Sequence, residues 1–299
     1  MYLYHFGLRK LPFSLTPDTE LFCSLNGYKE ALNTIQFALT TGEAFCHVSG
    51  EVGTGKTMLC RWVMNHIDDQ RMVAYLPNPI LTPKELKLAL ATELSIRVNK
   101  NTSEEQLIPK IQKKLIEINK VKGPVVLIID EAQTMPDETL EALRLFTNLE
   151  TETTKLLQII LFSQPELDRK LQQDHLRQLR QRIAFRYQLP SLSRRQIKLY
   201  LSHRLNRVAA KQRHFFSSSA YSVIAWASRG IPRLANIIAH KSLMVAFGRN
   251  HTHANVLDVL SAMSDTPDTS ARLKLYQRIA FAFTFLAFSS SALAYWVLG

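Results

Sequence analysis

Short apolar runs alternate with amphipathic stretches along the first two thirds of the chain. The runs typical of strands stand at 45–49, 72–76, 125–129, 156–162 and 183–189. Apolar residues recur at helical spacing between them, at about 28–39, 57–64, 83–96, 103–119 and 137–149. The run at 125–129 is aliphatic throughout, as in a strand that is buried on both faces of a parallel sheet. The pattern therefore predicts an α/β domain built on a parallel sheet.

After Pro190 the pattern changes to helices only. Helical spacing predicts them at about 193–210, 217–228, 232–247 and 254–263. We therefore expect an αβα domain at 1–189 and an all-helical domain at 190–265. Residues 1–27 mix aromatic residues with turn formers, which predicts a segment laid across the αβα domain with no helix or strand of its own.

A glycine-rich loop follows the first strand. Its sequence, Gly-Glu-Val-Gly-Thr-Gly-Lys-Thr, matches the phosphate-binding pattern G-x-x-x-x-G-K-[ST] at every fixed position. Lys56 would bridge the β- and γ-phosphates, and the Thr57 hydroxyl would ligate Mg²⁺. A flexible glycine turn beside a surface lysine is the alternative, which the flanking strand and helix disfavour. The residues expected to bind the nucleotide are Gly50, Glu51, Val52, Gly53, Thr54, Gly55, Lys56, Thr57 and Met58.

Two carboxylates end the aliphatic strand at 125–129. Asp130 would hold the Mg²⁺ shell, and Glu131 would orient or polarise the attacking water as a catalytic residue. Ligands of parallel sheets lie at the carboxyl ends of the strands, where these acids stand. The alternative is that both acids cap the helix that follows.

Polar residues also end the strand at 156–162, and they are candidates for a γ-phosphate sensor. Gln164 is the preferred catalytic sensor, while Ser163 could sense the phosphate instead. The other interpretation is that Ser163 caps the helix that Pro165 starts, because proline is favoured in a first helical turn.

Arginines occur at two further places that could serve a nucleotide. A group at 176–182 precedes the last strand, where an arginine could reach the γ-phosphate of a neighbouring subunit. Arg233 follows Pro232 at the start of a predicted helix and could face the nucleotide. A solvated basic surface is the alternative in both cases.

The basic character of the chain belongs to its second half. Net charge is +12; residues 1–150 carry 16 Lys and Arg against 18 Asp and Glu, whereas residues 151–299 carry 21 against 7. This asymmetry indicates an anionic partner, such as lipid headgroups, nucleic acid or an acidic protein. The cysteines, Cys23, Cys46 and Cys60, have no paired spacing, so neither a disulfide framework nor a zinc site is indicated.

The C-terminal residues have the pattern of a membrane anchor. A polar linker at 266–278 becomes basic and leads into residues 279–298, which carry no charged side chain. Twenty such residues suffice to span a membrane, and Tyr295 and Trp296 at the far end are typical interfacial anchors. The positive-inside rule then keeps the preceding domains in the cytoplasm. A hydrophobic helix docked into the core is the alternative.

Taken together, these motifs resemble those of AAA+ ATPases with an αβα core and a C-terminal helical lid. The closer resemblance is to the general secretion pathway protein A group and, within it, to the ATPases of mannose-sensitive haemagglutinin pilus biogenesis. It is carried by Phe6-Gly7-Leu8, Pro12-Phe13, Pro17-Asp18, the loop at 50–57, Asp130-Glu131-Ala132-Gln133, Gln164-Pro165-Glu166-Leu167 and Leu179-Arg180-Gln181-Arg182-Ile183.

The resemblance implies an ATPase that uses ATP and Mg²⁺, forms ring-like homo-oligomers and works at the bacterial inner membrane on type IV pilus or type II secretion assembly. By motif match Arg182 would be the arginine finger, with Arg180 as the other candidate, and Arg233 would be the second sensor. Secretion members continue past their membrane helix into a periplasmic peptidoglycan-binding domain. This sequence ends at Gly299, so we expect any periplasmic reach to come through a membrane partner.

Three functions compete on these motifs. The first is a membrane-anchored ATPase that supports pilus or secretion assembly. The second is an ATP-dependent DNA-binding regulator of the transposition kind, which the membrane span disfavours, so nucleic acid is not the expected partner. The third is a nucleotide-controlled scaffold, which the intact Glu131 disfavours. A DNA-binding regulator would bind the phosphates of the DNA backbone with the basic residues Arg194, Arg195, Lys198, Arg204, Arg207, Lys211 and Arg213.

Overall fold

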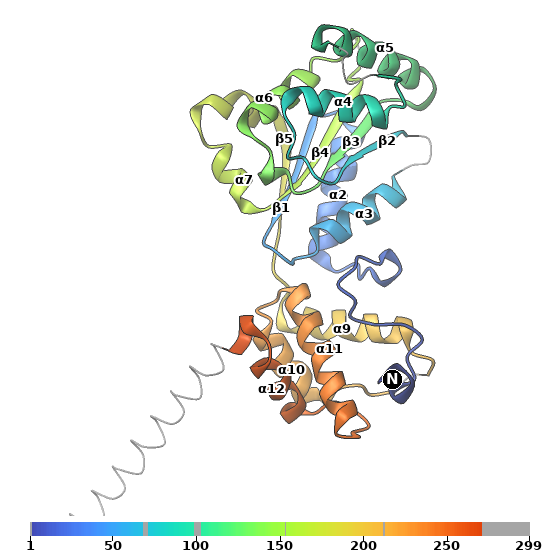
Figure 1. The fold of residues 1–299 in the computed structure, drawn as a ribbon, viewed down its shortest axis with the longest axis vertical. Coiled ribbons are helices and arrows are strands. Elements are labelled where there is room, and N and C mark those ends of the chain that lie inside the picture. The colour runs from blue at the N-terminus through green and yellow to red at the C-terminus, as the bar shows by residue number, and fades with distance from the viewer. Residues whose placement is uncertain (1, 68–70, 99–102, 153, 212, 271–299) are drawn as a thin grey trace, which may run out of the picture. The chain divides into compact units, whose positions relative to one another are not determined.

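The computed structural model describes residues 2–67, 71–98, 103–152, 154–211 and 213–270. These residues form two compact units. The αβα unit comprises the described residues of Pro17–Ser191, and the helical unit comprises residues 2–16 together with the described residues of 192–270. Figure 1 labels most of the elements of both units.

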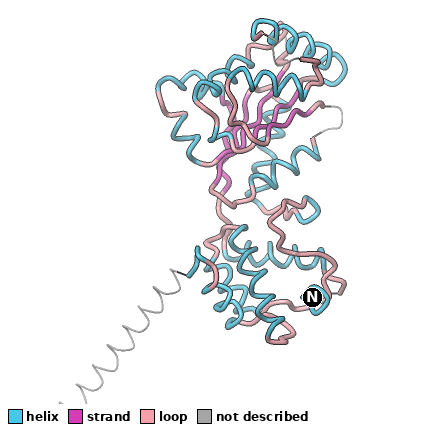
Figure 2. Tube along the Cα trace, viewed as in Figure 1, coloured by secondary structure: helices cyan, strands magenta, loops and turns pink. Residues whose placement is uncertain are grey.

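Five parallel strands form the sheet of the αβα unit (Figure 2). They are β1 (Phe45–Gly50), β2 (Val73–Leu76), β3 (Val125–Ile129), β4 (Leu157–Ser163) and β5 (Ile183–Leu189). Their order is β2-β3-β4-β1-β5, so the strand before the glycine-rich loop lies between β4 and the edge strand β5. The inner strands β1, β3 and β4 are buried at every residue. The predicted α/β class with a parallel sheet is confirmed.

Helices pack against this sheet on both faces (Figure 1). They are α2 (Asn26–Thr40), α3 (Lys56–His66), α4 (Pro83–Glu93), α5 (Glu104–Lys122), α6 (Asp137–Phe146), α7 (Pro165–Lys170) and α8 (Arg177–Arg182). Leu127 and Ile129 of β3 join one hydrophobic core with residues of α4, α5 and α6. Val126 and Ile128 alternate with them, are equally buried and point to the opposite face. There α2 and α3 pack against β1.

The described residues of the helical unit form four long helices and one short one. They are α1 (Tyr2–Phe6), α9 (Arg194–Val208), α10 (Ser218–Ala227), α11 (Pro232–Gly248) and α12 (Val256–Ser264). Capping side chains explain where two of these helices, α9 and α12, begin. The Ser193 hydroxyl accepts the Gln196 N–H while the Gln196 side chain accepts the Ser193 N–H, and Asn255 and Asp258 form the same reciprocal pair at α12.

The N-terminal segment departs from the sequence prediction. It carries the helix α1, and its first 16 residues group with the helical unit rather than with the αβα domain. Phe6 and Phe13 are buried, and Leu8 pairs with Ala209 in an antiparallel bridge. The Arg204 side chain is buried as well, and its Nε donates to the Pro12 carbonyl at 2.7 Å. Arg204 therefore belongs to the interior and not to the basic surface expected from sequence.

Gly230 fixes the turn between α10 and α11. Its φ is +77°, in the left-handed region that favours glycine, and its carbonyl accepts the Leu192 N–H at 2.8 Å. A Cβ at this position would lie 2.2 Å from the Leu192 carbonyl oxygen. The close approach of two backbone segments therefore requires a residue without a side chain.

The described part of the tail packs against α12. The Thr266 and Thr269 hydroxyls are buried and donate to the carbonyls of Ala262 and Met263. The predicted linker at 266–278 therefore begins as part of the helical unit. Among the described residues no helix is long and apolar enough to cross a membrane. The predicted span at 279–298 lies outside them.

Candidate nucleotide site

The glycine-rich loop connects β1 to α3 in the order expected from sequence. Gly53 and Gly55 have φ angles of +81° and +98°, so glycine stands where the backbone enters the left-handed region. The Tyr28 hydroxyl donates to the Thr54 carbonyl at 2.7 Å, and the Thr54 hydroxyl donates to the Glu51 carbonyl at 2.8 Å. These bonds hold the loop in one conformation. Tyr28 has no motif signal, because it lies on α2, away from the loop in sequence.

Lys56 begins α3 and turns its ammonium back into the loop. Lys56 is only 5% exposed. Its Nζ donates to the Gly50 carbonyl at 2.7 Å and to the Glu51 carbonyl at 3.0 Å. Burial lowers the pKa of Lys56, and the charges of Glu131 and Asp130 oppose that shift. The loop thus holds a cation at the point where its backbone curves.

Asp130 and Glu131 follow β3 at the carboxyl end of the sheet. Burial raises the pKa of Asp130, and hydrogen bonds from the Thr57 hydroxyl and the Glu131 N–H counter this shift. The structure therefore brings together Thr57 and Asp130, the two residues expected to serve Mg²⁺. Glu131 itself has φ +53°, an uncommon conformation for a residue with a side chain. This backbone turns the chain sharply after the strand.

Two glutamine amides hold the Glu131 carboxylate. Gln133 Nε2 and Gln164 Nε2 both donate to Glu131 Oε2, at 2.6 and 3.0 Å. Gln133 Oε1 in turn accepts the Gln164 backbone N–H at 2.9 Å. The predicted sensor Gln164 therefore lies against the predicted catalytic acid. Gln133 stands two residues after Glu131 and was not assigned a role from sequence.

Ser163 does not cap α7, which corrects one of the two sequence interpretations. The N-cap residue is Gln164, and the fully buried Ser163 hydroxyl bonds to His47 Nε2 at 2.7 Å and donates to the Gln164 carbonyl. His47 lies on β1, directly beside β4. Its other ring nitrogen is 3.6 Å from Asp168. Burial lowers the pKa of His47 to about 4, against the opposing charge of Asp168 and with a smaller contribution from Arg186.

The candidate arginines are on the surfaces of two different units. Arg182 is exposed at the end of α8, and Arg180, two residues earlier, is half-buried. The charge of Arg182 acts on Glu150, whose pKa is lowered mainly by its bond to Lys155. Arg233 is exposed near the start of α11, in the helical unit.

The residues present fit a nucleotide with Mg²⁺. A Cβ on Gly55 would come within 2.8 Å of the Tyr28 hydroxyl, so the loop is a cradle that a side chain would fill. Thr57 and Asp130 supply two oxygen donors, which suits Mg²⁺ because this ion keeps most of its shell for water and phosphate. Lys56, Thr57 and Asp130 would hold the phosphates and the metal.

Comparisons with known proteins agree with this geometry. Residues 39–171 match the family described as AAA domain. The chain is 38% identical over 249 residues to general secretion pathway protein A of Aeromonas hydrophila, which covers 83% of this chain. The resemblance inferred from the motifs is thereby confirmed at the level of this group. The chain spans 45% of the length of that relative.

Solved structures share the fold at low sequence identity. Cdc6p from Pyrobaculum aerophilum superposes with a TM-score of 0.68 at 18% identity, covering 85% of this chain and 70% of that one. The Aeropyrum pernix ORC1 protein in complex with DNA gives 0.64 at 17%, covering 86% and 69%. The Thermotoga maritima RuvB Holliday junction branch migration motor gives 0.55 at 17%, covering 83% and 73%. At these identities, the structures share the fold alone.

The buried His47 predicts a pH-dependent stability. Its pKa is about 4 in the folded chain against 6.5 for an ordinary histidine, so between these values only the unfolded chain binds the proton. The free energy of unfolding therefore falls as pH falls from 6.5 to 4, by on the order of 3 kcal/mol from this group. Urea unfolding at a series of pH values should show this loss, and His47→Gln should show less of it.

The matched control is His253→Gln, which removes an exposed histidine of the helical unit. It should keep the pH dependence of the unchanged protein. An equal pH slope in His47→Gln and the unchanged chain would contradict the assignment of this titration to His47.

Proposed function

Because residues 39–171 match the family described as AAA domain, we propose that this chain binds ATP together with Mg²⁺ and hydrolyses it. The observation that carries the proposal is the assembly of Lys56, the Thr57–Asp130 pair and Glu131 at the carboxyl end of one sheet. Residues far apart in sequence meet there with the charges that phosphoryl transfer requires.

Each residue of the site has a distinct role in this proposal. Mg²⁺ would neutralise charge on the phosphate oxygens when bound. Lys56 binds phosphate with an ammonium that burial has already stripped of water, so little solvent reorganisation is needed. Glu131 orients a water and accepts its proton. Gln164 positions Glu131 through its 3.0 Å bond and reports the occupancy of the site.

Substitution of Lys56 and Glu131 should separate binding from hydrolysis. Lys56→Ala should abolish ATP binding, because it removes the only cation that the described loop residues supply inside the cradle. Glu131→Gln should still bind ATP but hydrolyse it at least about a hundredfold more slowly, since the amide cannot accept a proton. Nucleotide binding and phosphate release measure the two effects. If Glu131→Gln hydrolyses ATP as fast as the unchanged protein, Glu131 does not accept the proton of the attacking water.

We further propose that subunits associate and that Arg182 acts on the nucleotide of a neighbouring subunit. Its exposure at the end of α8 leaves it accessible to a second copy. Mixing Arg182→Ala with Glu131→Gln protein should then restore part of the activity, because mixed interfaces regain one complete site. Specific activity should also rise with protein concentration.

Two matched substitutions sharpen this test. Arg177→Ala removes another exposed arginine of α8 and should leave activity unchanged. Arg180→Ala tests the other candidate for the finger. If mixing with Glu131→Gln protein restores activity to Arg180→Ala but not to Arg182→Ala, the arginine finger is Arg180. If no mixture regains activity and specific activity does not depend on protein concentration, neither arginine acts on a neighbouring subunit.

The biological setting proposed is secretion or pilus assembly. The identity of 38% to general secretion pathway protein A supports a secretion-related ATPase. Within that group the motifs favour assembly of a type IV pilus of the mannose-sensitive haemagglutinin kind or of a type II secretion complex. Partners would be assembly proteins, including one that reaches the periplasm. Arg233 would act as a second sensor on the nucleotide.

Anchoring in the bacterial inner membrane is part of the same proposal, with the ATPase in the cytoplasm. Its support is the uncharged sequence at 279–298 after the cations of 272–278. The full chain should stay with membranes through an alkaline wash, and truncation after Asp268 should release it while ATP binding persists. Complete release of the full chain by the wash, with salt-sensitive retention on DNA, would favour the DNA-binding alternative.

A further inference from the structure

The helical unit contains a cavity of about 590 Å³ between α9 and α10. Its apolar part is formed by Leu205 and by Phe215 and Phe216, which are all buried. A volume of this size falls within the range of small-molecule sites in proteins. Every lining residue belongs to the helical unit, so the cavity is independent of the P-loop in the other unit.

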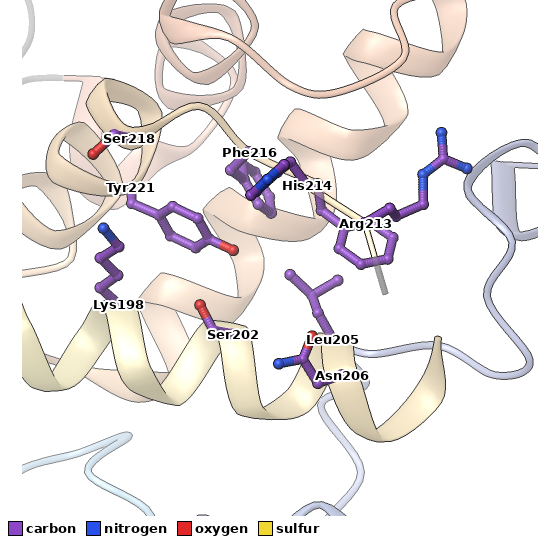
Figure 3. A pocket seen from close by; sticks show the side chains of 10 residues that line it. Lys198, Ser202, Leu205, Asn206, Arg213, His214, Phe216, Ser218 and Tyr221 are labelled. Atoms are coloured by element: carbon purple, nitrogen blue, oxygen red, sulfur yellow. The ribbon is translucent and has the colours of Figure 1, made fainter. Parts of the chain in front are cut away.

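Polar groups from three segments face the same space (Figure 3). Lys198, Ser202 and Asn206 come from successive turns of α9, Tyr221 from α10, and His214 from the connection between them. The Lys198 ammonium lies 5.8 Å from the centre of the Tyr221 ring. The Tyr221 hydroxyl is directed toward the Ser202 hydroxyl (Figure 3), and the two side chains form a hydrogen bond. Ammonium, hydroxyl, amide and imidazole groups thus line one cavity together with apolar side chains.

No carboxylate lines this cavity among the residues that the structure describes. The sequence explains why, since residues 1–16 and 192–270 contain 13 Lys and Arg but 3 Asp and Glu. Asp258 is occupied by Arg249 and His251, and Asp265 by Lys241. Lys198 therefore brings a positive charge to the cavity that no lining acid neutralises.

We propose that this cavity binds a small phosphomonoester that carries an apolar or aromatic group. A phosphate presents three acceptor oxygens and close to two negative charges at neutral pH, which matches the donors around Lys198 better than a single carboxylate does. The apolar group would lie against Leu205 and Phe216. A duplex backbone would need a protruding surface, whereas this site is concave. The inference goes beyond the ATPase function and does not rest on it.

Phenyl phosphate is the probe for this site, because it combines one phosphomonoester with one aromatic ring. Its binding to the full chain is measured by titration calorimetry in saturating Mg-ADP, which keeps the P-loop occupied. Lys198→Gln should weaken binding at least about tenfold, as expected for the loss of one charge-assisted hydrogen bond. Asn206→Ala should also weaken it, without a change in charge. Both residues are exposed, so neither change removes a core contact.

Arg195→Gln is the matched control, since it removes one exposed positive charge from α9 outside the cavity. It should change the affinity by less than about twofold. Equal losses in Arg195→Gln and Lys198→Gln would show that only overall charge matters and would overturn the site. Binding that is unaffected by Lys198→Gln would do the same. If inorganic phosphate binds as tightly as phenyl phosphate, the apolar part of the assignment is overturned. If benzoate binds more tightly than phenyl phosphate, the choice of a phosphate ligand is overturned.

Discussion

The Lys56 ammonium lies inside the P-loop, where burial has removed its water and the carbonyls of Gly50 and Glu51 replace it. A cation in such a place is stable only if its surroundings supply acceptors and negative charge. Glu131 and Asp130 supply that charge from the end of β3. The Lys56 side chain thus connects the loop and the helix α3 to the end of the inner strand β3.

A chain of hydrogen bonds connects this site to the interior of the sheet. His47 on β1 holds the Ser163 hydroxyl at the end of β4, and Ser163 donates to the Gln164 carbonyl. The Gln164 side chain then reaches the Glu131 carboxylate. Because His47 is buried and its pKa is low, it is neutral at physiological pH, and this arrangement does not vary with pH in that range. The position of Gln164 is therefore set by core packing and not by a surface loop.

The two units of the chain differ in their electrostatic design. The αβα unit places acids beside cations at one site, as catalysis on phosphates requires. The helical unit has many cations and few acids, and its acids Asp258 and Asp265 are engaged in ion pairs. Cations that remain without such partners attract anions from solution. The proposed phosphomonoester cavity around Lys198 is one place where the fold concentrates this excess.

Local pattern was enough to predict the strands, the long helices, the P-loop and the acids at 130–131, because each depends on residues close together in sequence. The parallel sheet followed from the wholly aliphatic run at 125–129. Only the tertiary structure decided which residues from distant parts of the sequence contact the loop and the acids at 130–131. His47 reads in sequence as one residue of an apolar strand, and only the pairing of β1 with β4 brings it to Ser163. The segment at 1–16 joins the helical unit because Phe6 and Phe13 find their apolar neighbours there, and no periodicity of so short a segment can specify a partner that lies two hundred residues away.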